Sequence, residues 1–235
     1  MDQVAPLVSQ WLNQTKELEL ELRFGRVEPA VKNAFTGIHF NGSCLSRDHF
    51  LKLVQTMTQY NGWSSVEGWS VSVDACFEQN QRLTLRSSAD ESIVREDINM
   101  EKLQHRVFYG LYLPYCIRLT LKQEQAIKIA HNLQTAQLIR IKKRCRFVYK
   151  QLFAYDFTVV KTTSDWKQAE TSPETLPETY EIEMELLHSP QLRDKYPDAT
   201  SQRRLVYEWL WKAQQLIQQL SSNCTLPCMW TPIVS

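Results

Sequence analysis

The stretch KELELELRFGR at positions 16–26 decides the fold, because charged and apolar residues alternate along it without a break. Alternation with a period of two is typical of a β-strand, whose successive side chains point to opposite faces. One face carries Glu17, Glu19, Glu21 and Arg23, and the other carries Leu18, Leu20, Leu22 and Phe24. Like charges on one face destabilise a strand, so we expect a cation among these glutamates.

A second acidic strand, EIEMEL at 181–186, repeats this pattern near the other end of the chain. Between the two, the sequence predicts strands that carry bases on one face. Their shared faces consist of Arg82, Thr84 and Arg86, of Arg118, Thr120, Lys122 and Glu124, and of Arg140, Lys142, Arg144 and Arg146. The strand FAYDFTVV at 153–160 places Asp156 and Thr158 together. Acids therefore segregate to the first and last strands, and bases to the middle ones.

This segregation favours a closed barrel over an open, solvated sheet. Any one such strand is what an antiparallel sheet presents to water. Salt bridges between exposed acidic and basic strands would add only about 0–1 kcal/mol each, which does not explain the segregation. We therefore expect an α+β, β-rich fold: a closed eight-stranded antiparallel β-barrel with a charged interior and helices packed on its apolar outside.

A charged interior needs compensating ligands. Buried carboxylates must be neutralised or have their pKa values raised, and clustered bases need an anion. A divalent cation on one wall and a phosphate chain on the other satisfy both sets. Carboxylate ligands favour hard cations, so we expect Mg²⁺ or Mn²⁺.

The remaining segments complete a single expected domain, 1–235, with barrel strands at about 17–187. Apolar periodicity predicts terminal helices at about 2–14 and 201–220. A further helix is expected after the N-cap Ser46, burying Phe50, Leu53, Val54 and Met57. The polar segment 162–179 predicts a long surface loop, and 221–235 a tail or a connection to something further on.

Composition excludes several other classes. The 27 basic and 26 acidic residues give a net charge of +1, so no global field attracts nucleic acid or membrane. The sequence predicts neither a membrane span nor a signal peptide, which indicates an intracellular protein. The six cysteines show no zinc-ligand spacing. The P-loop G-x-x-x-x-G-K-[ST], the H-C-x-x-x-x-x-R phosphatase signature and the K-x-D-G motif are all missing from the sequence.

Four motifs in order resemble a known family, the fungal-type, metal-dependent RNA 5′-triphosphatases of mRNA capping, within the triphosphate tunnel metalloenzyme superfamily. The motifs are ELELRFG (19–25), RIKKRCRFVY (140–149), YDFTVV (155–160) and EIEMEL (181–186). The resemblance spans roughly 17–186. It implies an eight-stranded tunnel that hydrolyses the γ-phosphate of a 5′-triphosphate RNA end, the first step of capping, with nucleoside triphosphatase side activity in Mn²⁺.

The resemblance and the inward faces together assign roles to individual residues. The metal ligands are Glu19, Glu21 and Glu185. The catalytic residues are Glu183, which would hold the attacking water, Glu181 in support, and Glu124. The substrate-binding residues are Arg23, Arg82, Arg86, Arg118, Lys122, Lys142, Arg144, Arg146, Asp156 and Thr158. Residues 88–110 are hard to align with the family, and Arg95 and Lys102 are weak candidates there.

The expected partners are the 5′-triphosphate RNA end and a guanylyltransferase, as a separate protein or a further domain. The sequence also allows a homodimer, and predicts no membrane association. The resemblance implies a nuclear location, or a cytoplasmic virus factory if the chain is viral.

Two alternatives stay open from the sequence. One is a superfamily member that acts on tripolyphosphate, thiamine triphosphate or nucleotides; such relatives typically open with E-x-E-x-K, whereas here Arg23 is followed by Phe24 and Gly25. The other is a noncatalytic polyphosphate-binding module. Both acidic strands, 16–26 and 181–186, keep all their glutamates, which argues against this alternative.

Overall fold

The computed structural model describes residues 4–13, 18–32, 35–87, 93–110, 115–128, 132–188, 191–220 and 230–232. The strands are β1 (Leu18–Lys32), β2 (Phe35–Asn41), β3 (Ser65–Cys76), β4 (Gln81–Ser87), β5 (Ile93–Gly110), β6 (Cys116–Ala126), β7 (Leu138–Tyr149), β8 (Phe153–Thr163), β9 (Glu178–Leu186) and β10 (Trp230–Pro232). The helices are α1 (Ala5–Asn13), α2 (Arg47–Gln59), α3 (Trp166–Thr171), α4 (Gln191–Lys195) and α5 (Ala199–Gln218). Short 3₁₀ turns are η1 (Glu78–Asn80), η2 (Leu133–Thr135) and η3 (Pro173–Thr175).

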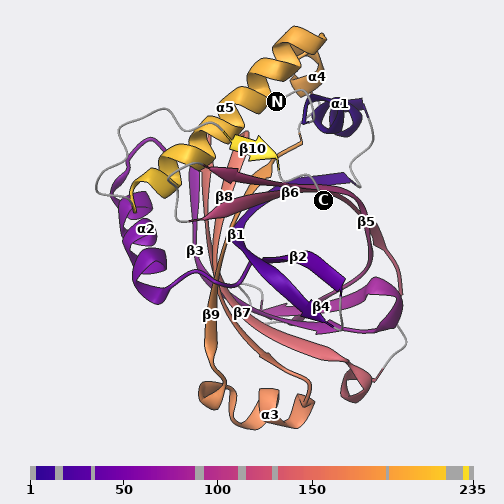
Figure 1. The fold of residues 1–235 in the computed structure, drawn as a ribbon. Coiled ribbons are helices and arrows are strands. Elements are labelled where there is room, and N and C mark those ends of the chain that lie inside the picture. The colour runs from indigo at the N-terminus through magenta and orange to yellow at the C-terminus, as the bar shows by residue number, and fades with distance from the viewer. Residues whose placement is uncertain are drawn as a thin grey trace.

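The first strand closes the sheet into a barrel, since β1 pairs with β9 along one edge and with β6 along the other. The ring runs β1, β6, β5, β4, β3, β7, β8, β9 and back to β1, with antiparallel pairing throughout. Figure 1 shows this ring with helices outside it. The expected eight-stranded antiparallel barrel is therefore confirmed. Two additional strands lie off the ring: β2 pairs with the second half of β1, and β10 with the end of β5.

The cross-strand register puts the charged faces of the strands on one side. Glu21 lies opposite Thr120 on β6 and Glu185 on β9, and Arg146 on β7 lies opposite Asp156 on β8. Residues opposite each other in an antiparallel pair share a face of the sheet. The acidic and basic ladders therefore line the inside of the barrel together.

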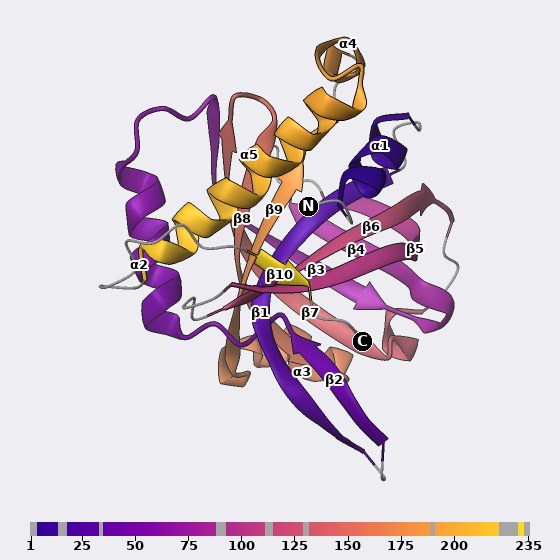
Figure 2. The ribbon, with the colours of Figure 1, turned by 45° about the horizontal axis from the view of Figure 1, so that its top comes forward.

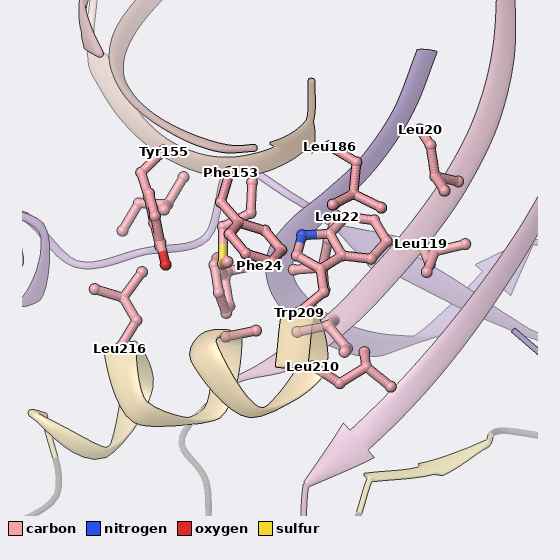
Figure 3. Packing of buried hydrophobic residues seen from close by; sticks show 14 of the residues in the cluster. Leu20, Leu22, Phe24, Leu119, Phe153, Tyr155, Leu186, Trp209, Leu210 and Leu216 are labelled. Carbon is pink, nitrogen blue, oxygen red and sulfur yellow. The ribbon is translucent and has the colours of Figure 1, made fainter. Parts of the chain in front are cut away.

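The apolar faces of the same strands form the main core, which lies outside the barrel. Leu20, Leu22 and Phe24 of β1 are completely buried there. Figure 3 shows α5 lying across these side chains and contributing Trp209 and Leu210 to the same layer. Burial of one such side chain contributes about 1.5–3 kcal/mol, so the outer layer supplies much of the stability of the fold.

The helices lie close to where the sequence predicts them. The terminal helices expected at 2–14 and 201–220 correspond to α1 and α5. The α2 helix begins after the N-cap Ser46 and buries Phe50, Leu53 and Met57. Val54 is only partly buried against the core, which differs from the prediction. Among the described residues, no helix has the length and apolar character needed to cross a bilayer.

The prediction of one long surface loop over 162–179 is wrong. β8 continues to Thr163, α3 and η3 follow, and β9 begins at Glu178. The carboxylate of Asp165 accepts hydrogen bonds from the backbone N–H groups of Lys167 and Gln168, which caps α3. This helix is short and mostly polar, so it lacks the apolar stripe that would have revealed it.

Candidate active site

The barrel encloses a cavity of about 250 Å³, and among the described residues only charged side chains line it. Of these described lining residues, seven are acidic and seven are basic. They are Glu19, Glu21, Glu124, Asp156, Glu181, Glu183 and Glu185, together with Arg23, Arg82, Lys122, Arg140, Lys142, Arg144 and Arg146. All except Arg140 are among the site residues that the sequence predicts, so folding brings that set together. The individual roles stay predictions.

Lys122 lies at the centre of the acidic part of the lining. Its Nζ is 3.1 Å from Glu19 Oε2, 3.2 Å from Glu21 Oε2 and 3.2 Å from Glu124 Oε1. One ammonium group thus serves three carboxylates. Glu185 adds a fourth acid nearby, directly opposite Glu21 in the register.

The acids around Lys122 differ in their affinity for protons. Burial raises the pKa of Glu19 to about 8, and the charges of Glu21 and Glu185 add to the rise while Lys122 opposes it. Burial also opposes ionisation of Glu21, but Lys122 and Arg23 outweigh it and lower its pKa to about 2. Burial raises the pKa of Glu185 as well. Glu19 therefore keeps its proton near neutral pH, whereas Glu21 is ionised beside Lys122.

The chemistry of these donors fits a divalent cation. Carboxylate oxygens are the ligands that Mg²⁺ and Mn²⁺ prefer, and Glu19, Glu21 and Glu185 are the predicted set. Among the described residues, however, no three acidic, histidine or cysteine side chains are arranged so that they could hold a metal ion. Lys122 takes the place of a cation between Glu19 and Glu21. Binding of a divalent ion therefore requires Lys122 to withdraw.

Two acids of β9 are held by arginines of β7. Arg146 Nη2 lies 2.9 Å from Glu185 Oε2, and Arg140 Nη2 lies 2.7 Å from Glu181 Oε2. The hydroxyl of Ser43 also donates to Glu181 Oε1 at 2.7 Å. Both carboxylates are therefore fixed in orientation, and the bases that hold them face the cavity.

Glu183, the predicted partner of the attacking water, lies between two arginines. Arg23 pairs with its Oε1, and Arg144 Nη2 lies 3.6 Å from its Oε2. Arg144 is braced in turn, because its Nε donates to Thr158 Oγ1 at 3.1 Å and its Nη1 lies 3.3 Å from Asp156 Oδ2. The D-x-T strand thus positions a base of the neighbouring strand.

Sequence reasoning missed one buried acid, Asp74 on β3. Its Oδ2 lies 2.6 Å from Lys142 Nζ, and Thr84 donates to its Oδ1 at 2.8 Å. Burial opposes its ionisation, but Lys142 and Arg82 outweigh burial and lower the pKa of Asp74. Burial lowers the pKa of Lys142 to about 8. The polar alternation in SVSVDAC at 70–76 was the signal that could have revealed this strand and its acid.

Several donors facing the interior have no partner. Arg23 Nε, Arg82 Nε, Arg118 Nε and the Thr120 hydroxyl are buried and make no hydrogen bond with the described part of the chain. A buried donor without a partner costs about 1–3 kcal/mol. Three of these donors belong to arginines of β1, β4 and β6, which favours an anion as the group that completes them.

Three predicted substrate-binding residues lie off the cavity lining. Arg86 is 54% exposed and pairs with Glu96 at 3.3 Å. Thr158 is buried behind Arg144, so its contact is with the base and not with the cavity. Arg118 lies beside the cavity, opposite Arg23 in the register.

The two weaker candidates, Arg95 and Lys102, lie on opposite faces of the barrel wall. Arg95 is exposed and pairs with Asp97 on the same face of β5, away from the cavity. Lys102 lies opposite Lys122 in the register and therefore shares its face. Glu17, the first acid of the opening stretch, lies outside the described residues.

Comparison with solved structures shows that other proteins share this fold. No protein-family model matches the sequence, and no curated protein matches it. The solved structure of the RNA triphosphatase Pct1 of S. pombe matches with a TM-score of 0.70 at 16% identity, over 93% of this chain and 92% of that chain. The same enzyme in complex with the Spt5 CTD matches equally well.

The RNA triphosphatase domain of a trifunctional mimivirus mRNA capping enzyme also matches. The TM-score is 0.59 at 16% identity, over 92% of this chain and 95% of that chain. The chain therefore shares the tunnel fold of these RNA triphosphatases over nearly its whole length.

Proposed function

We propose that this chain is an RNA 5′-triphosphatase, which hydrolyses the γ-phosphate of a 5′-triphosphate RNA end and leaves a 5′-diphosphate. The observation that carries the proposal is a cavity that, among the described residues, only charged side chains line, together with buried donors on or beside it that have no described partner. A triphosphate chain supplies the acceptors that these donors lack. The shared fold with two RNA triphosphatases supports RNA as the carrier of that triphosphate.

The bases and acids would divide the work of the reaction. Phosphoryl transfer through a loose transition state depends mainly on positioning and on electrostatic stabilisation. Arg144 and Arg146 would bind phosphate oxygens through two-point contacts, which guanidinium groups provide. Glu183, fixed between Arg23 and Arg144, would accept a hydrogen bond from the attacking water and align it with the γ-phosphorus.

Glu19, Glu21 and Glu185 would hold Mg²⁺ or Mn²⁺. When bound, such an ion supplies positive charge that neutralises phosphate oxygens as the bond to the leaving group breaks. Lys122 would then be free of two of its carboxylates and could turn toward a phosphate. Glu124 and Glu181 would support the water and its neighbours.

The proposed product indicates which partner enzyme to expect. A 5′-diphosphate RNA end is the acceptor in guanylyl transfer, so we expect a guanylyltransferase, either as a separate protein or as a further domain. The nucleus, or a virus factory, is the location we propose for such an enzyme. A homodimer stays a prediction.

The test measures phosphate release from 5′-triphosphate RNA, ATP and inorganic tripolyphosphate, with Mg²⁺ and with Mn²⁺. We expect RNA to be cleaved at far lower concentrations than the other two, and ATP to be cleaved in Mn²⁺. Preference for tripolyphosphate would favour the small-molecule alternative. Tight binding of all three without phosphate release would identify a noncatalytic module.

A further inference from the structure

Beside the cavity an arginine lies next to an aromatic ring, and the described residues offer it no anionic partner. Arg118 on β6 lies directly opposite Arg23 on β1, so two cations are neighbours. The guanidinium of Arg118 lies 4.8 Å from the centroid of the Phe40 ring. No hydrogen bond or ion pair joins the Arg118 side chain to any residue that the structure describes, and its buried Nε lacks an acceptor there.

The hairpin of β1 and β2 brings Phe40 to this position. It extends beyond the barrel (Figure 2), and its register places Phe40 opposite Val27, on the face of Gly25 and Arg23. A Cβ on Gly25 would lie 2.5 Å from Phe40 Cζ, and one on Gly42 would lie 2.5 Å from Arg23 Cδ. Both glycines are therefore needed for the hairpin to pack this closely on the tunnel wall.

The spacing along the strands relates this pair to the predicted metal ligands. Thr120, whose hydroxyl also has no partner among the described residues, lies opposite Glu21, and Arg118 follows on the same face two residues away. Two residues of a strand span ~7 Å. A triphosphate whose γ-phosphate lies near Glu21 and whose chain runs toward Arg118 would bring its later phosphates to this arginine, and the first nucleoside would come next.

We propose that Arg118 and Phe40 form a subsite for the first nucleotide of the substrate. Arg118 would bind the phosphate attached to the ribose, and the base would extend the stack of guanidinium and ring, as bases do on aromatic and arginine planes. This inference rests on the proposed function and refines it. It makes Phe40 a specificity-determining residue that favours nucleotide-bearing triphosphates over inorganic tripolyphosphate.

The test compares the native chain with Phe40→Ala and uses two ligands, a 5′-triphosphate RNA and inorganic tripolyphosphate. Affinities are measured calorimetrically with a chelator present, and kcat/KM is measured with Mn²⁺. We expect the preference for RNA over tripolyphosphate to fall about tenfold, the size expected from losing one stacked base. Phe40→Tyr, which keeps the ring, should retain the native preference.

A matched control is Arg26→Ala, because Arg26 lies 5.3 Å from the ring of Tyr115 in a similar cation–aromatic pair at an exposed position. It should leave the preference as in the native chain. Equal losses for both ligands in Phe40→Ala, or no loss for either, would overturn the subsite. If the native chain binds RNA but hydrolyses neither ligand, the proposed function fails while the binding data still decide on the subsite. If it neither binds nor hydrolyses either ligand, both fail.

Discussion

The two faces of β1 have opposite chemistry although they alternate residue by residue. Leu20, Leu22 and Phe24 are completely buried against α5, whereas Glu19 and Glu21 face a charged cavity. Small β-barrels can fill their interior with apolar side chains. Here the interior of the barrel is charged, and the apolar core lies between the outside of the barrel and the helices. One strand therefore serves stability with one set of residues and the proposed chemistry with the other.

This difference predicts that stability and activity can be changed separately. Removing a group from the outer layer should lower the free energy of unfolding. Removing a charge from the inner layer should lower turnover, because these side chains line the cavity in which the proposed reaction takes place.

The largest effect is expected for Leu22→Ala. It deletes a completely buried side chain and should lower the free energy of unfolding by about 2–5 kcal/mol, measured by urea denaturation. Turnover per folded molecule should stay near the native value. If the variant lost turnover but kept native stability, Leu22 would have to face the cavity and not the outer apolar layer.

Glu21→Ala should show the converse. Turnover in Mn²⁺, measured per folded molecule, should fall about 10²-fold, the size typical of losing one group that stabilises the transition state. The same fall is expected for Glu19→Ala and Glu185→Ala. Glu101→Ala, at an exposed carboxylate of β5, is the control and should keep native turnover. Near-normal activity in any of the three would remove that residue from the metal site.

Arg144→Lys should lower kcat/KM about tenfold, because an ammonium cannot reproduce the two-point contact of a guanidinium with phosphate, Thr158 and Asp156. Arg95→Lys, at an exposed ion pair outside the cavity, is the matched control. Native kinetics in Arg144→Lys would mean that this side chain does not contact the substrate.

The smallest effect concerns pH. Because the pKa of Glu19 is raised to about 8, a divalent ion must displace its proton, and Mn²⁺ affinity should rise by up to about tenfold per pH unit until about pH 8. Without metal, the folded chain binds this proton more tightly than the unfolded chain does. The contribution of Glu19 to stability is therefore present at low pH and lost as the pH rises toward 8. Glu19→Gln should flatten both profiles; an unchanged slope in this variant would show that another group titrates.

Local patterns were sufficient to predict the barrel and most of its lining. The alternation in 16–26 and 181–186 specifies which side chains share a face, and the segregation of charge indicates that these faces meet. Arg140 shares its face with Lys142 and Arg144, but the resemblance predicts no role for it; the structure shows that it holds Glu181.

Contacts that depend on folding in three dimensions could not be predicted. Asp74 follows a run of serines and valines at 70–73 of β3, and only the pairing of β3 with β7 and β4 brings it to Lys142 and Thr84. The placement of Phe40 depends on close packing against Gly25, which no periodicity encodes.

The central claim is that the acidic side of the tunnel binds a divalent ion in place of Lys122. Anomalous diffraction from crystals grown with Mn²⁺ tests it most directly. We predict one strong peak among Glu19, Glu21 and Glu185, with the Lys122 ammonium moved away from Glu19 and Glu21. No peak there, with Lys122 still 3.1–3.2 Å from both carboxylates, would contradict the account.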